Sequence, residues 1–187
     1  MTRWLLILFC LISVALIPGG NPAHAGQDDP RLNGQFISLL DAKDPQQGQI
    51  IETRIWALWL ASGDQATDEE MARGILFMNA GDLRQALNSF DKIVASAPNF
   101  AEGWNKRATV YYLMGDLKRS VLDIERTVAL EPRHFGAFSG LGLIYMATGD
   151  DEAALRAFER VLQIHPLYGD IAHLALELRK KIKGQKT

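Results

Sequence analysis

The sequence contains almost no cysteine. Its 187 residues include a single one, Cys10, inside an apolar N-terminal stretch. If that stretch is removed on export, the remaining chain cannot form a disulfide bond and depends on packing for its stability. Ile7, Leu8 and Phe9 before the cysteine are bulky, unlike the small residues that precede a lipid-modified cysteine. We therefore expect no lipid anchor at Cys10.

The chain also lacks an excess of positive charge. It has 20 Lys and Arg residues against 22 Asp and Glu, which gives a formal net charge of -2. A nucleic-acid-binding protein needs clustered Lys and Arg to neutralise phosphates. Here charges of both signs are mixed along the sequence, as on solvated helix faces. We predict no nucleic-acid partner.

Residue patterns of a catalytic or metal site are missing as well. Beyond the N-terminal stretch the histidines are His134, His165 and His173, and none has a second histidine three or four residues on. No serine lies in a nucleophile-elbow motif, and Gly140 and Gly142 stand inside a predicted helix rather than a phosphate loop. His134 and His165 stand beside prolines, where we expect them to face solvent or a helix carboxyl end. We predict no enzyme, no metal and no cofactor.

No apolar run is long enough to span a membrane, although the N-terminal one indicates export. Arg3 precedes a largely apolar run from Trp4 to Ile17, which is followed by Pro18-Gly19-Gly20 and Ala23-His24-Ala25. The run has about fourteen residues, fewer than the roughly twenty that cross a bilayer core. This layout is typical of a secretory signal peptide. We predict a signal peptide over residues 1–25, cleaved after Ala25, with an uncleaved anchor as the alternative.

Residues 26–66 are predicted to form a linker and a helical pair. Gly26–Pro30 reads as a mobile linker, followed by apolar residues at helical spacing up to about Lys43. Asp44-Pro45 begins a second helix, because an acceptor side chain followed by proline is a good N-terminal signal. Trp56 and Trp59 on this helix form either core that covers the next repeat or an aromatic platform for a ligand.

Residues 67–168 repeat one pattern three times, at a spacing of 34 residues. The copies are 67–100, 101–134 and 135–168. Each contains two amphipathic segments of helical length, a Gly-Asp pair between them, and a later proline. The glycines are Gly81, Gly115 and Gly149, and the prolines are Pro98, Pro132 and Pro166. We expect glycine to allow a turn with positive φ, aspartate to cap the second helix, and proline to end it.

A small residue recurs at one position in the first segment of each copy. These residues are Gly74, Ala108 and Gly142. We expect them to let the two helices of a pair approach closely, because a larger side chain would hold the backbones apart.

This pattern resembles the tetratricopeptide repeat (TPR) family over residues 67–168. Further matching positions are Phe77, Ala86 and Phe90, then Trp104, Tyr111 and Ser120, then Phe138, Leu141, Tyr145, Ala154 and Phe158. The resemblance implies an all-α fold, an α-solenoid of stacked antiparallel helix pairs forming a right-handed superhelix. Residues 26–66 would add a degenerate N-terminal pair, and residues 169–187 a C-terminal capping helix and tail with an exposed basic face.

The chain departs from the family pattern at a few positions. Arg73 and Arg107 replace a large apolar residue, Ile124 replaces an aromatic one, and Glu70 replaces a bulky one. Glu69 and Glu70 stand one turn before Arg73 and can pair with it. The two arginines either lie on apolar surface with their charges in solvent, or join a buried charge network or an acidic ligand.

The resemblance implies a concave wall, lined by the first helix of each pair, that binds an extended peptide or a partner helix. It places there Met71, Ile75, Met78 and Asn79, then Asn105, Lys106, Thr109, Tyr112 and Leu113, then Ser139, Leu143 and Met146. The set is mostly apolar, and methionine adapts to irregular partner surfaces. Asn105 can bond a peptide backbone. Only Asn105 and Lys106 offer the chemistry with which some TPR domains hold a C-terminal carboxylate, so we do not expect that role.

We therefore expect a non-catalytic adaptor or assembly factor of the bacterial periplasm. Its partner would be another protein or peptide, of the cell envelope, held in the concave groove, and the mature form would not bind membrane. The alternatives are a homo-oligomer whose groove is occupied by its own chain, and a groove covered by the N-terminal helices.

Overall fold

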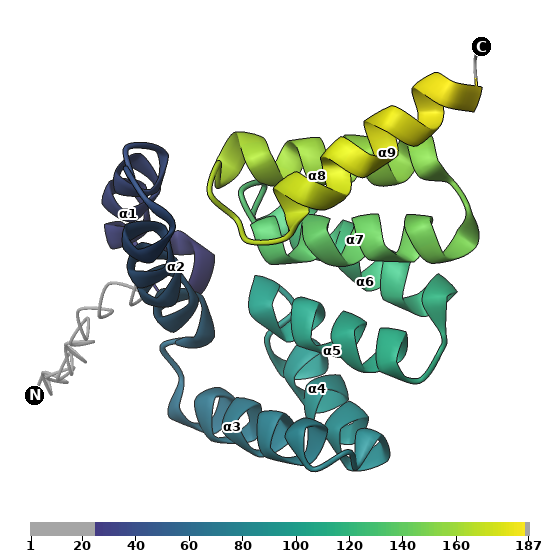
Figure 1. The fold of residues 1–187 in the computed structure, drawn as a ribbon. Coiled ribbons are helices and arrows are strands. Elements are labelled where there is room, and N and C mark those ends of the chain that lie inside the picture. The colour runs from purple at the N-terminus through teal and green to yellow at the C-terminus, as the bar shows by residue number, and fades with distance from the viewer. Residues whose placement is uncertain (1–24, 186–187) are drawn as a thin grey trace, which may run out of the picture.

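A computed structural model describes residues 25–185, so the predicted signal peptide lies outside the described residues except for Ala25. Within this range every regular element is a helix (Figure 1). The elements are the 3-10 helix η1 (Gly26–Asp28) and the α-helices α1 (Arg31–Leu40), α2 (Pro45–Leu60), α3 (Gln65–Asn79), α4 (Leu83–Ser96), α5 (Ala101–Leu113), α6 (Leu117–Leu130), α7 (Phe135–Thr148), α8 (Asp151–Ile164) and α9 (Ile171–Gln185).

Helices α3 to α8 form three antiparallel pairs that stack in sequence order (Figure 1). Each pair is one predicted repeat: α3 with α4, α5 with α6, and α7 with α8. The first helices α3, α5 and α7 lie next to one another, and α9 packs on α8 at the end of the stack. This arrangement confirms the predicted all-α solenoid, a right-handed TPR superhelix with a capping helix.

The turn within each pair has the predicted chemistry. Gly81, Gly115 and Gly149 have φ of 78°, 79° and 82°, in the left-handed region that glycine adopts at little cost. The aspartate after each glycine accepts a hydrogen bond from the backbone N–H three residues on, capping α4, α6 and α8. Each second helix ends two residues before its proline.

The small residues allow close helix packing, as predicted. A Cβ atom added at Gly74 would lie 2.6 Å from the ring of Phe90 on the paired helix. At Gly142 the added atom would overlap the ring of Phe158. Because both rings are fully buried, they could not move aside without opening the core.

Helix α9 covers the last pair with one apolar face. Ile171, Ala175 and Leu178 are buried in the same core cluster as the residues of α8. The opposite face is exposed and basic, and Arg179 and Lys181 form ion pairs with Glu159 and Asp151 of α8. The prediction of a cap with a polar outer side is confirmed.

The segment before α1 is not the free linker that the sequence suggested. Residues 26–28 form η1. The side-chain amide of Gln27 makes hydrogen bonds at the start of α5 through both its oxygen and its nitrogen. Its Oε1 accepts from the N–H of Ala101, and its Nε2 donates to the carbonyl of Asn99. Helix α1 also ends at Leu40 rather than near Lys43. The start of α2 agrees with the sequence, because Asp44 caps it and Pro45 is its first residue.

The pair α1 and α2 does not extend the stack. Instead it lies to one side of it, against the N-terminal ends of α5 and α7 and against α8 (Figure 1). Its buried residues Leu32, Phe36, Ile55 and Trp59 share one core with Phe135 and with α8. Sequence adjacency suggested packing on the first repeat, whereas the apolar faces meet the second and third.

No helix among the described residues is both long and apolar enough to cross a bilayer.

Candidate functional site

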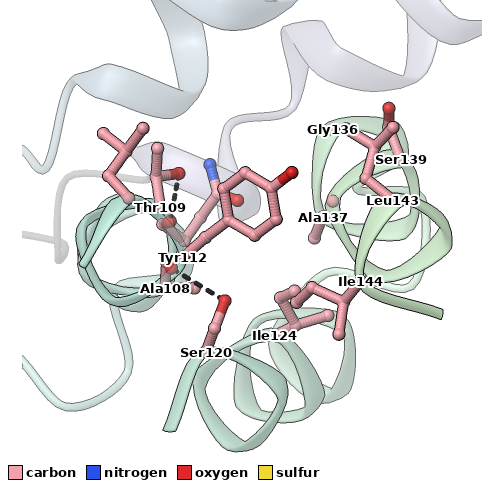
Figure 2. Close-up of a pocket in the computed structure, with 13 residues that line it drawn as sticks. Ala108, Thr109, Tyr112, Ser120, Ile124, Gly136, Ala137, Ser139, Leu143 and Ile144 are labelled. Atoms are coloured by element: carbon pink, nitrogen blue, oxygen red, sulfur yellow. Dashed lines mark hydrogen bonds between the residues drawn. The ribbon is translucent and has the colours of Figure 1, made fainter. Parts of the chain in front are cut away.

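A cavity of about 300 Å³ opens between α5 and α7, with α6 as its floor (Figure 2). Residues from α5 form one wall and residues from α7 the other. Tyr112 reaches from α5 toward α7, with Ile124 and Ile144 below it (Figure 2). Six of the residues predicted for the concave wall line this cavity, namely Asn105, Thr109, Tyr112, Leu113, Ser139 and Leu143.

The polar groups of the cavity wall are largely satisfied within the protein. The hydroxyl of Thr109 donates to the carbonyl of Asn105 (3.0 Å), and that of Ser120 donates to the carbonyl of Ala108 (2.8 Å). No charged side chain is among the lining residues. The cavity therefore offers mainly carbon surface to an occupant.

The structure does not bring the first-repeat candidates into this cavity. Met71 is only 2% exposed and belongs to the core with Phe90, so its prediction as a groove residue is wrong. Ile75 and Met78 are half-buried against the same core, and Asn79 is exposed at the end of α3. From the third repeat, Met146 packs half-buried against the core that includes α8.

Asn105 and Lys106 are held in a buried cluster around Glu102. The Glu102 carboxylate is 1% exposed and accepts a hydrogen bond from Nδ2 of Asn105 (3.1 Å). The Lys106 ammonium lies 3.0 Å from its Oε1. Both polar candidates thus have a partner inside the protein, and neither is positioned for a carboxylate-binding role.

His134 completes this cluster. Its Nδ1 accepts from the backbone N–H of Ala137, so Nε2 carries the ring proton and donates to Glu102 (2.9 Å). Burial acts to raise the pKa of Glu102, but the Lys106 charge and the His134 hydrogen bond outweigh it and hold that pKa below its ordinary value. Glu102 is therefore a carboxylate at neutral pH.

We expected His134 and His165 to face solvent or a helix carboxyl end; neither faces solvent, and His165 stands at the carboxyl end of α8. His134 is 0% exposed and caps α7, while His165 is 1% exposed with its Nε2 3.4 Å from Glu52. The sequence could not indicate that these histidines are buried, because residues that cover them belong to α2, more than seventy residues earlier in the chain. The ring of Trp59 stacks on His134 at a centroid distance of 4.1 Å.

Trp56 and Trp59 are packing residues rather than a ligand platform. Trp59 is 1% exposed, and both rings contact Phe135 at the start of α7. A Cβ atom on Gly136 would lie 2.5 Å from the Trp56 ring, so this site requires a glycine.

Burial, with the negative charge of Glu52 nearby, raises the pKa of Tyr168 beside this cluster to about 12.

The two unusual arginines behave differently. Arg73 is half-exposed and pairs with Glu70 (2.8 Å), in the way the sequence predicted. Arg107 forms a bidentate pair with Asp123, at 2.7 and 2.8 Å, and a third bond to Asp91. The Asp123 hydrogen bonds raise the pKa of Arg107 above its ordinary value. Arg107 therefore joins three successive helices in a charge network and does not reach the cavity.

Three residues important to this region were not identified as site residues from the sequence. Glu102 organises the polar cluster, Gly136 accommodates Trp56, and Ile124 forms the cavity floor. A signal existed only for Ile124, which breaks the aromatic pattern of the repeat. The others acquire their roles through contacts with distant segments.

Stacked antiparallel helix pairs with a cavity between their first helices define the class of helical-repeat solenoids. A family model described as "Tetratricopeptide repeat" matches residues 71–124 and 106–168, which together span more than half of the sequence. The chain belongs to the tetratricopeptide repeat family.

Similar proteins agree with this fold. A TPR repeat-containing protein of Rhizobium etli is 34% identical over 84 residues, which cover 45% of this chain and 41% of that protein. The chain thus spans about two fifths of this relative. Among solved structures, the first TPR of Spaghetti bound to an HSP90 peptide superposes with a TM-score of 0.61 at 20% identity, covering 64% of this chain and 94% of that one.

Two further structures resemble the chain to a similar degree. The TPR2B domain of yeast Sti1 in complex with an Hsp70 peptide has a TM-score of 0.58 at 14% identity, covering 63% of this chain and 99% of that one. The Sgt2 TPR domain of Aspergillus fumigatus has a TM-score of 0.61 at 19% identity, covering 66% and 83%. At these identities the likeness establishes the fold.

Proposed function

We propose that this protein is an exported bacterial TPR adaptor or assembly factor, non-catalytic, that binds a segment of another cell-envelope protein between α5 and α7. The main observation is the open, uncharged cavity there, lined by half-exposed Tyr112 and Leu143. Structures with the same fold are described with HSP90 and Hsp70 peptides bound, which supports a polypeptide ligand. The N-terminal sequence supports export.

The position of the N-terminal pair limits where a partner can bind along α5 and α7. Because α2 covers the N-terminal ends of α5 and α7, a partner would lie along their later turns, where Tyr112, Leu113 and Leu143 are exposed. Covering by α1 and α2 is therefore partial, and an apolar wall remains accessible.

The test uses two cavity residues that take no part in the Glu102 cluster. We expect the double variant Tyr112→Ala with Leu143→Ala to lose capture of partners from an envelope fraction, measured by pull-down and mass spectrometry. Helical content by circular dichroism should be unchanged. The matched control is Leu122→Ala, an exposed leucine of α6 outside the cavity. Equal capture by all three proteins would contradict the proposal.

Export is tested separately. Cell fractionation should place the protein in the periplasm, and N-terminal sequencing should find a chain that begins at Gly26. A cytoplasmic protein with an intact Met1 would contradict this part of the proposal while leaving the binding site open to the test above.

Self-association is a second candidate, favoured by exposed apolar residues near the ends of α3 and α5. Leu76, Leu113 and Met114 are 67%, 52% and 47% exposed. Light scattering after size exclusion should then show a stable dimer that the variant Leu113→Ser disperses. A monomer at all concentrations would leave the adaptor as the proposed function.

A further inference from the structure

The third repeat has a second hollow, of about 250 Å³, formed by α7 and α8. Its lining residues are Phe138, Leu141, Tyr145, Ala153, Arg156, Ala157 and Arg160. None of them lines the cavity between α5 and α7, to which α7 contributes other residues. A ligand in this hollow would therefore leave that cavity free.

The second repeat shows what fills the corresponding place elsewhere in the chain. Arg107 stands 34 residues before Leu141, and Asp123 stands 34 residues before Ala157. The two charged residues form a bidentate ion pair, with distances of 2.7 and 2.8 Å. Leu141 and Ala157 have neither the guanidinium nor the carboxylate group, so the third repeat leaves open the space that this pair occupies in the second.

The same difference leaves an aromatic ring of the third repeat without its cover. In the second repeat the guanidinium of Arg119 lies 4.5 Å from the ring centroid of Tyr111. The corresponding residues of the third repeat are Ala153 and Tyr145, and an alanine is too short to cover the ring. Tyr145 and Leu141 therefore offer apolar surface inside the hollow.

The charged residues of the lining are both positive. They are Arg156 and Arg160, which are exposed. Arg160 donates to two neutral oxygen atoms, each at 3.2 Å. Within the part of the chain that the structure describes, neither arginine forms an ion pair with a carboxylate, and Glu159, next to Arg160 in sequence, pairs with Arg179 of α9 instead. The hollow thus combines an apolar floor with two guanidinium groups that favour carboxylates.

We propose that this hollow is a docking site for an acidic segment of a partner protein. A bulky apolar side chain of the segment packs on Leu141 and Tyr145, and neighbouring Asp or Glu residues pair with Arg156 and Arg160. It is a second binding site, on residues of α7 other than those that line the cavity, and it does not depend on occupation of that cavity.

The test begins with peptides that bind the hollow. They are selected from a random phage library on the purified wild-type protein, after binders of a filled variant have been removed. The filled variant is Leu141→Arg with Ala157→Asp, which transfers the ion pair of the second repeat into the hollow. Circular dichroism should show the same helical content as in the wild type.

A second variant removes the charges and keeps the space. It is Arg156→Gln with Arg160→Gln, and because both positions are exposed the fold should not change. The matched control is Arg119→Gln with Arg126→Gln, which removes two exposed arginines of α6 in the second repeat. Dissociation constants of the selected peptides are measured for the wild type and for all three variants.

We expect the selected peptides to share a bulky apolar residue with Asp or Glu beside it. The filled variant should weaken their binding by roughly 10- to 100-fold, as expected when an apolar side chain is no longer buried. The variant without charges should weaken it by roughly 3- to 20-fold, as expected for two exposed ion pairs. It should not weaken a peptide whose acids are replaced by amides, and the control should bind every peptide as the wild type does.

NMR shows where the peptides bind. In the wild type the methyl signals of Ala153 and Ala157 should shift with a selected peptide, while that of Ile144, which lines the other cavity, should not. The cavity variant Tyr112→Ala with Leu143→Ala should bind the selected peptides as the wild type does.

Each other result overturns the proposal. No peptide specific to the wild type, peptides without acidic residues, or peptides whose affinity the filled and uncharged variants leave unchanged would show that the hollow does not bind an acidic segment. A wild-type dimer that the variant without charges disperses would make a second copy the occupant. If 3-phenylpropionate shifts the alanine signals while no peptide does, the occupant is a small molecule. In all these cases the cavity between α5 and α7 keeps its own test, so the proposed function is unaffected.

Discussion

At the scale of single residues, two glycines of α7 have opposite surroundings. Gly142 faces the buried ring of Phe158, whereas Gly140 faces open space with only Ile124 nearby. Both stand inside a helix, where alanine is intrinsically preferred over glycine by about 1 kcal/mol. Packing therefore decides the effect of the same substitution at the two positions.

We predict that Gly142→Ala lowers the free energy of unfolding by about 1–3 kcal/mol, because the added methyl group overlaps the Phe158 ring. Gly140→Ala should raise it by up to about 1 kcal/mol. Urea denaturation followed by circular dichroism measures both. Equal effects of the two substitutions would show that α7 and α8 do not pack as closely as they do in this structure.

A second prediction at this scale concerns pH and Glu102. Its pKa in the folded protein lies below the ordinary 4.5 of the unfolded chain, owing to Lys106 and His134 against the effect of burial. The ionised carboxylate therefore adds stability that is complete above pH 4.5 and is lost as the pH falls through the lower folded pKa.

Glu102→Gln should accordingly reduce the free energy of unfolding at neutral pH by about 1–3 kcal/mol. The difference from the wild type should stay constant above pH 4.5 and narrow as the pH falls below it. Urea titrations across this range are the measurement, with the exposed Glu125→Gln as a control that follows the wild type. A difference that widens in acid would contradict the assigned direction of the shift.

At the scale of elements, the N-terminal pair is joined to the stack by a group of aromatic residues centred on Trp59. Trp59 stacks on His134 and touches Phe135, and it shares its core with α1 and α8. Trp56 against Gly136 and Phe135, and Glu52 beside His165, add further contacts between α2 and the stack. The pair is therefore held to the stack mainly through the residues around Trp59 and not by continuing the repeat packing.

We predict that Trp59→Ala costs about 3–5 kcal/mol of packing and frees α1 and α2 while the three repeats stay folded. Hydrogen exchange should accelerate in α1 and α2 first, and limited proteolysis should cut near Gly63. The control Trp104→Ala removes a half-exposed indole on α5. It should leave α1 and α2 protected, and uniform exchange across the whole chain in Trp59→Ala would contradict an independent pair.

At the scale of the whole molecule, each helix pair is covered by the next one, and the stack needs a cover at its end. Helix α9 supplies it through Ile171, Ala175 and Leu178. The exposed ion pairs of its outer face, such as Lys180 with Glu177, contribute little because solvent screens them.

Truncation after Tyr168 should therefore lower the free energy of unfolding by about 3–6 kcal/mol, the burial of two large aliphatic side chains. The exposed face of α8 should also cause aggregation, visible by light scattering and dye binding. In the full chain, Arg179→Gln with Lys180→Gln should change neither the free energy of unfolding nor the aggregation. A truncated chain that stays monomeric and as stable as the full one would contradict the capping role.

The sequence by itself determined the repeats. The turn glycines, the capping aspartates and the fit of Gly74 with Phe90 involve residues close together in the chain. Such local interactions require the same residue types at the same positions of every copy, so they are recognisable from the sequence period. The walls of the cavity followed from this register, although Ile124 was noted only as an exception to it.

Only the tertiary structure decided where the N-terminal pair lies and which polar groups are buried. Trp56 meets Gly136 across eighty positions of sequence, and Glu102 meets His134 across thirty-two. An apolar helix face does not encode which of several apolar surfaces it will cover, because burial is non-directional. The fit between side chains decided which surface α2 covers, since Gly136 leaves room for the Trp56 ring.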